Sequence, residues 1–259
     1  MRIDLPLVDI HTHIGHLPGI VGEVFTAQDL VTISEQEGAR FMLASSASAS
    51  TIGQHYATLE TVEMVRQHSD RLGGMLWLNP HDPAWQADID LALQHHFYGI
   101  KIHPVLDHYA VEWRALDGVF SAAKQHGWPI LTHTDEDGSS MDASCYEPLV
   151  QAYPDVILIL AHLRWGAIPL AKRYPNVFLD TTYVDPRTVE TGVDALGPGK
   201  ILFGSDAAEG FDVGHPVGRV RPPRSYASLI AGLRARGLSE PALEKILFQN
   251  AVDIFHLSV

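Results

Sequence analysis

The stretch Val156-Ile157-Leu158-Ile159-Leu160-Ala161-His162 decides the fold of this chain. Its apolar run is continuous rather than alternating, as expected of a parallel strand that other elements cover on both faces. The run then ends at a histidine. A buried strand that delivers a polar side chain at its carboxyl end is typical of parallel α/β sheets that carry a functional site there.

The same unit recurs along the whole chain, because short apolar or β-branched runs alternate with longer amphipathic segments. Eight runs are predicted strands: residues 7–10, 40–44, 74–78, 99–103, 130–133, 156–162, 177–181 and 201–204. Nine segments have helical patterns: residues 27–37, 56–67, 83–96, 113–126, 145–152, 167–173, 186–195, 225–236 and 239–255.

This alternation predicts an α/β protein with a single (β/α)8 TIM barrel, regular or distorted, over residues 1–259. The last helical segment would be an extra C-terminal helix. An open, doubly wound sheet is the alternative. No Gly-x-Gly-x-x-Gly follows the first predicted strand, which counts against that alternative.

Acidic residues outnumber basic ones, since 31 Asp and Glu against 18 Lys and Arg give a formal net charge of −13. Such a charge repels nucleic acids, whose binding rests on cations that neutralise phosphates. The arginine cluster in a predicted loop is Arg219, Arg221 and Arg224. We therefore expect a small-molecule substrate, no nucleic acid and no membrane, with a homo-oligomer left open.

Cys145 is the only cysteine, which excludes an intrachain disulfide and a cysteine-rich metal site. The first residues lack the basic and apolar segments of a signal peptide. The longest apolar run, residues 156–161, is far shorter than the roughly 20 residues that span a bilayer. The expected compartment is the cytoplasm.

Chemically active side chains gather at the predicted strand ends, where a parallel barrel places its active face. They are His11, His13, Lys101, His103, His133, His162 and Asp206. Side chains two apart on a strand share a face, so His11 and His13 can hold one divalent ion together. A lone His-x-His is often accidental and a buried histidine is often a packed core residue. The coincidence at several strand ends favours a metal site.

These stretches resemble the amidohydrolase superfamily, and most closely its amidohydrolase-2 branch of aminocarboxymuconate-semialdehyde decarboxylase-like enzymes. The resemblance covers essentially the whole chain. It rests on Val8-Asp9-Ile10-His11-Thr12-His13, Gly99-Ile100-Lys101-Ile102-His103-Pro104, Pro129-Ile130-Leu131-Thr132-His133, Leu158-Ile159-Leu160-Ala161-His162, Asn176-Val177-Phe178-Leu179-Asp180-Thr181, Leu202-Phe203-Gly204-Ser205-Asp206 and Gln249-Asn250-Ala251.

The resemblance implies a divalent metal, with zinc as the expected ion and one ion rather than two. The implied ligands are His11, His13, His133 and Asp206. Asp206 would also act as general base, and His162 as a catalytic or second-metal residue. In some branches the lysine at the position of Lys101 is carboxylated and bridges two ions, with His133 and His162 on the second.

The substrate contacts stay open in the sequence. Lys101 can bind a substrate carboxylate or pair with an acid, and His103 can orient the substrate or pack beneath a loop. Arg164 stands where relatives often have a glycine-rich turn, and it is either an anion binder or part of a surface salt bridge. Two further departures are the acidic stretch at residues 134–138 and the Ala207-Ala208-Glu209-Gly210 that follows Asp206.

The leading hypothesis is hydrolysis of a small carboxylate-bearing ester, lactone or amide by metal-activated water. The alternative is a metal-dependent non-oxidative decarboxylase on the same scaffold. A third hypothesis is a metal-binding barrel without catalysis. Fold and ligands do not separate them, because function depends on the loops.

Overall fold

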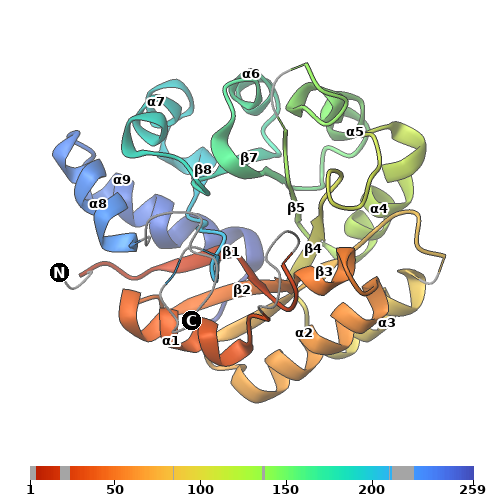
Figure 1. Ribbon diagram of the computed structural model, residues 1–259. Helices are drawn as coiled ribbons and strands as arrows, with labels where there is room; N and C mark the ends of the chain where they lie inside the picture. Colours follow the sequence, from red (N-terminus) through yellow and green to blue (C-terminus); the bar gives the residue numbers. More distant parts are fainter. Residues whose placement is uncertain (1–3, 18–23, 84, 136–137, 210, 212–224) are drawn as a thin grey trace.

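A computed structural model describes residues 4–17, 24–83, 85–135, 138–209, 211 and 225–259. Eight parallel strands lie in chain order around one sheet, with helices outside them (Figure 1). The strands are β1 (Val8–Ile14), β2 (Phe41–Ser46), β3 (Leu72–Trp77), β4 (Gly99–Ile102), β5 (Ile130–Thr132), β6 (Leu158–Leu160), β7 (Val177–Asp180) and β8 (Ile201–Leu202).

The barrel closes through the segment that follows β8, since β8 itself has only two residues. The Ile10 N–H donates to the Phe203 carbonyl at 3.1 Å, and the Asp206 N–H donates to the His11 carbonyl at 2.8 Å. Thr12 also forms a parallel bridge with Ala207. The predicted TIM barrel is confirmed.

Helices cover the outside of the barrel (Figure 1). They are α1 (Ala27–Glu37), α2 (Gln54–His68), α3 (Trp85–Gln94), α4 (Trp113–His126), α5 (Glu147–Ala152), α6 (Ala167–Arg173), α7 (Pro186–Leu196), α8 (Tyr226–Ala235), α9 (Glu240–Glu244) and α10 (Asn250–Phe255). Short 3-10 turns lie at Ala47–Ser50, Ala143–Tyr146, Ala161–Leu163 and Pro198–Lys200. Among the described residues, no helix is long and apolar enough to cross a membrane.

The predicted C-terminal helix is present, but a π turn at Lys245–Gln249 divides it into α9 and α10. The Ile246 carbonyl in this turn accepts the Phe203 N–H at 2.9 Å. The Asn250 amide donates to the carbonyls of Ile201, at 2.7 Å, and Pro198, at 2.8 Å. The C-terminal helix therefore supplies hydrogen-bond partners around the short β8.

The barrel interior is an apolar cluster to which several strands and α10 contribute. Ile10, Leu43, Leu131 and Ile159 are buried in it, together with Phe255 of α10. A second, larger cluster lies between the sheet and the helices. Because α10 packs on the interior cluster, the C-terminal helix forms part of the barrel core.

Several strand boundaries differ from the prediction, and the differences in β1 and β6 lie at histidines. β1 continues through His11 and His13 to Ile14, whereas β6 stops at Leu160. His162 lies in a 3-10 turn with a φ of 74°. The carboxylate of Asp180 accepts its N–H at 2.8 Å, which stabilises the turn instead of a further strand residue.

Candidate metal centre

A bulge in β1 aims its two histidines into the barrel. The pairing of β1 with β2 shifts register between Asp9 and Thr12. Asp9 points outward, where its carboxylate accepts hydrogen bonds from the hydroxyls of Ser205 and Tyr226. The next residue, Ile10, is buried in the interior cluster. After the shift His11 and His13 line the central cavity. Bulges commonly re-aim side chains next to functional sites in this way.

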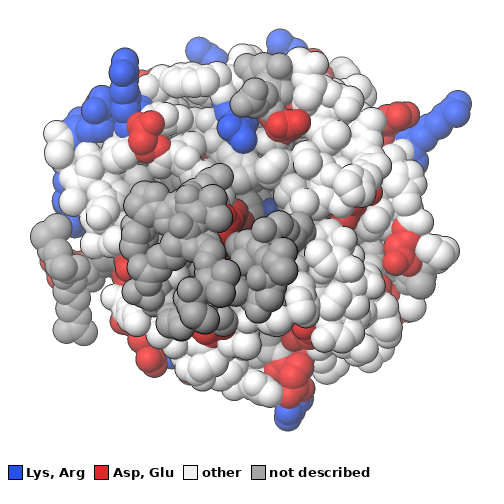
Figure 2. All heavy atoms as spheres, viewed as in Figure 1, with Lys and Arg blue, Asp and Glu red and all other residues white. Residues whose placement is uncertain are grey.

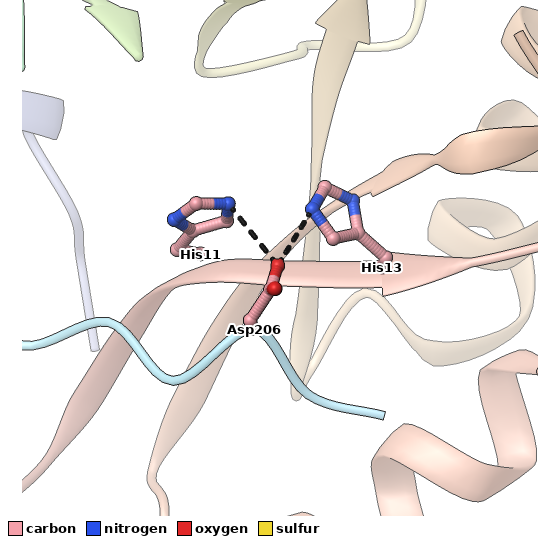
Figure 3. Close-up of side chains that lie close together, drawn as sticks. All are labelled: His11, His13 and Asp206. Carbon is pink, nitrogen blue, oxygen red and sulfur yellow. Dashed lines mark ion pairs between the residues drawn. The ribbon is translucent and has the colours of Figure 1, made fainter. Parts of the chain in front are cut away.

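His11, His13 and Asp206 form a three-residue group that can hold a metal ion (Figure 3). Asp206 Oδ1 lies 3.4 Å from His11 Nε2 and 3.1 Å from His13 Nε2. One ligand atom from each of the three lies within 4.8 Å of the others. Two imidazoles and a carboxylate leave positions open for substrate, as a catalytic site requires.

The outer nitrogens of both histidines have partners that fix the rings. His11 Nδ1 lies 2.8 Å from Asp180 Oδ2, and His13 Nδ1 lies 3.3 Å from the Ser45 carbonyl. With Nδ1 protonated toward these acceptors, each Nε2 keeps a lone pair that could bind an ion held together with Asp206. Burial lowers the pKa of His11, which keeps it in the neutral form that binds metals.

Asp180 is fully buried and stays ionised. Burial by itself would raise the pKa of its carboxyl, but His11 and the hydrogen bonds from His11 and the His162 backbone lower it to about 2. The Thr182 N–H also donates to Oδ1, at 3.0 Å. Asp180 belongs to a stretch that carries the family resemblance, but the resemblance assigned it no role. The signal for a role in the site is the position of Asp180, an acidic residue at the end of a predicted strand.

Lys101 is buried, and its Nζ lies 2.6 Å from His11 Nε2. Burial lowers the pKa of Lys101 to about 8, against the attraction of Asp206 and Asp180. The lone pair of His11 Nε2 cannot serve both this ammonium and an ion. Ion binding therefore requires Lys101 to move away, to become neutral or to be modified.

His133 and His162 form a separate pair, in which His133 Nδ1 lies 2.8 Å from His162 Nε2. Burial lowers the pKa of His133 to about 2 and that of His162 to about 4, so both are neutral near pH 7. His162 Nδ1 is buried without a hydrogen-bond partner among the described residues. His133 thus lies in the cavity beside the group of His11, His13 and Asp206. We call the pair of His133 and His162 the second layer.

A stack of flat side chains supports this second layer. The ring of His103 stacks on His133, with centroids 4.1 Å apart, and on Trp77 at 5.5 Å. Trp77 Nε1 donates to Asp107 Oδ2 at 3.0 Å. Nothing in the sequence motifs singles out Trp77. Its contact with His103 depends on the register in which β3 pairs with β4, and the sequence pattern does not predict that register.

One cavity of about 360 Å³ is lined by both the three-residue group and the histidines beside it, His103, His133 and His162. Figure 2 shows the face of Figure 1 with a hollow near its centre, in which acidic and basic atoms are visible. The lining includes Arg164, Tyr183 and Glu209, and the Tyr183 hydroxyl donates to Glu209. Arg164 Nε is buried without an acceptor among the described residues. The sequence indicates a role for Arg164 and none for Tyr183 or Glu209.

Some predicted features lie outside the described residues. They are Glu136 and Asp137 of the acidic stretch, Gly210, and the arginine cluster of Arg219, Arg221 and Arg224. On the described part of the face in Figure 2, blue side chains are scattered and form no broad basic patch.

The fold and the candidate ligand group define a (β/α)8 barrel with a site that could hold a metal ion, and the family comparison identifies the family. The amidohydrolase family model (Amidohydro_2) matches residues 8–257, so the chain belongs to this family. The resemblance found in the sequence is thereby confirmed, and membership supports an enzyme. No curated protein sequence matches the chain.

Solved structures share the barrel at low sequence identity. A 5-carboxyvanillate decarboxylase from Sphingomonas paucimobilis is 15% identical with a TM-score of 0.74, covering 98% of this chain and 100% of its own. A second one, from Novosphingobium aromaticivorans, holds manganese; it is 13% identical with a TM-score of 0.74 and 98% of each chain covered. A probable 2-pyrone-4,6-dicarboxylic acid hydrolase from Acinetobacter baumannii is 12% identical with a TM-score of 0.71, covering 98% and 100%. At these identities the likeness shows the fold.

Proposed function

We propose that this protein is a metal-dependent, non-oxidative decarboxylase of a small aromatic or similarly conjugated carboxylic acid. The observation that carries the proposal is the group of His11, His13 and Asp206 at the floor of a cavity whose other walls carry neutral histidines. Two of the three structural relatives described above are decarboxylases of an aromatic acid, which favours this reaction over hydrolysis.

A divalent ion bound by His11, His13 and Asp206 would bind the substrate carboxylate and draw electron density from it. The donor set suits zinc, the expected ion, and also manganese, which a relative holds. We assign His133 to the wall rather than to this set, because the ligand atoms that lie within 4.8 Å of one another come from His11, His13 and Asp206. One ion, rather than two, fits this assignment.

The protein's own residues would handle the proton that the reaction needs. In decarboxylation the bond between the carboxyl carbon and the ring carbon breaks, carbon dioxide leaves, and a proton takes its place on that ring carbon. Asp206 faces both histidines through Oδ1, and we assign its Oδ2 as the atom that exchanges this proton with the substrate. His162, hydrogen-bonded to His133, is the second candidate for proton transfer in the cavity.

The test is turnover in deuterated water with 5-carboxyvanillate and 2,6-dihydroxybenzoate as first substrates. We expect carbon dioxide release with one deuteron bound to the carbon that lost its carboxyl group. Asp206→Asn should lower kcat by a factor on the order of a thousand, which is the size expected when a ligand and proton-transfer group is lost. Metal analysis of both proteins shows whether the loss is one of binding or of chemistry.

Hydrolysis by metal-activated water is the second candidate, favoured by the probable pyrone hydrolase among the relatives. Release of a new carboxylic acid from a lactone, with oxygen from solvent and no carbon dioxide, would establish it in place of decarboxylation. If Asp206→Asn leaves the biological activity intact, the protein is instead a non-catalytic metal-binding barrel.

A further inference from the structure

Arg164 is a cation that lines the cavity wall. It follows His162 in the turn after β6, and the Ala167 N–H donates to its carbonyl at 3.0 Å, which fixes the backbone. Its Nε is buried and has no acceptor among the described residues, and no described carboxylate forms a salt bridge with its guanidinium. Removing a guanidinium nitrogen from water without an acceptor costs free energy, which an anionic ligand would recover.

The rest of the wall directs an anion toward Arg164. The acidic residues of the described lining are Asp206 and Glu209, and both belong to the segment after β8. Lys101 is bonded to His11 and does not appear in the lining. Within the described lining, Arg164 is therefore the residue with a permanent positive charge, and Glu209 repels an anion from the neighbouring part of the wall.

We propose that Arg164 binds a second anionic group of the substrate, so that the substrate is a small dicarboxylic acid. One carboxylate would lie at His11, His13 and Asp206, and the other would accept two parallel hydrogen bonds from the guanidinium. This inference rests on the proposed function, from which it takes the carboxylate at the metal-ligand group.

The test compares diacids with matched monoacids by calorimetric titration of the manganese-loaded protein. The probes are isophthalate, terephthalate and the monomethyl ester of each, which keeps the ring and removes one charge. We expect at least one diacid to bind on the order of 10- to 100-fold more tightly than its ester, as charge-assisted hydrogen bonds allow. Arg164→Met should abolish this preference, and Arg164→Lys should keep only part of it.

Arg187→Met is the matched control, because Arg187 is exposed, lies at the start of α7 and is absent from the described lining. It removes the same charge and should leave the preference unchanged. The proposal is overturned if neither diacid is preferred, or if Arg164→Met weakens diacid and ester equally while its circular dichroism spectrum stays that of the wild type. Binding is read without turnover, so absence of carbon dioxide release would contradict only the proposed function.

Discussion

Asp180 links three parts of the candidate metal centre through one buried carboxylate. It orients His11 through Nδ1, and it accepts the backbone N–H groups of His162 and Thr182. Its role is thus to position one metal ligand and the turn that carries His162. A carboxylate behind a ligating histidine fixes the ring and makes its other nitrogen a better ligand.

Asp180→Asn should therefore weaken metal binding on the order of 10- to 100-fold, because an amide cannot accept from both the imidazole and the two backbone groups as a carboxylate does. Metal affinity is measured by titration of the chelator-treated protein. Asp253→Asn, which removes the negative charge of an exposed side chain on α10, should keep the wild-type affinity. Equal affinity in the two variants would contradict the positioning role.

Asp9 provides a pH-dependent contribution to stability. Burial raises its pKa from 3.8 to about 7, although hydrogen bonds from Ser205 and Tyr226 oppose the shift. A raised pKa means that the folded state binds this proton more tightly than the unfolded state. The contribution is complete below about pH 4 and is lost as the pH rises toward 7, and it amounts to about 4 kcal/mol over that range.

Asp9→Asn removes this titration, so the free energy of unfolding of the metal-free variant should fall less steeply between pH 4 and 7 than that of the wild type. Urea unfolding at several pH values measures both slopes. Parallel curves for the two proteins would show that Asp9 does not titrate in this range.

At the scale of elements, β8 depends on the C-terminal helix. The two hydrogen bonds of the Asn250 amide, to Pro198 and Ile201, hold the start of α10 against a strand of only two residues. Asn250→Ala would leave two carbonyls without this donor, and we expect it to lower the free energy of unfolding by about 2–3 kcal/mol. Urea denaturation measures the change. Gln249→Ala, which removes an exposed bond to Asp253, should have little effect.

At the scale of the whole molecule, the order and type of the strands could be predicted because apolar runs and amphipathic segments alternate so regularly. The grouping of His11, His13 and Asp206 followed from their places at strand ends. The β1 bulge could not be predicted, since nothing in the local pattern shows that the pairing with β2 shifts after Asp9. The contact of Tyr183 with Glu209 depends on loop conformations, which the strand pattern does not determine.

A divalent ion at the candidate metal centre should stabilise the entire fold, because its ligands lie on both sides of the seam where the barrel closes. Removal of the ion by a chelator is expected to lower Tm and to speed hydrogen exchange in β1 and in residues 203–207 before other strands. Exchange measured by mass spectrometry tests this. A uniform change over all strands would contradict a special role for the seam.

The closing segment has a consequence for the order in which the protein matures. Asp206 lies in the stretch that completes the barrel against β1, while His11 and His13 lie near the start of the chain. During synthesis the two histidines would emerge from the ribosome long before their carboxylate partner. A nascent chain therefore cannot assemble the three-residue group until all eight strands have been made, so capture of the ion would follow synthesis of the complete sheet.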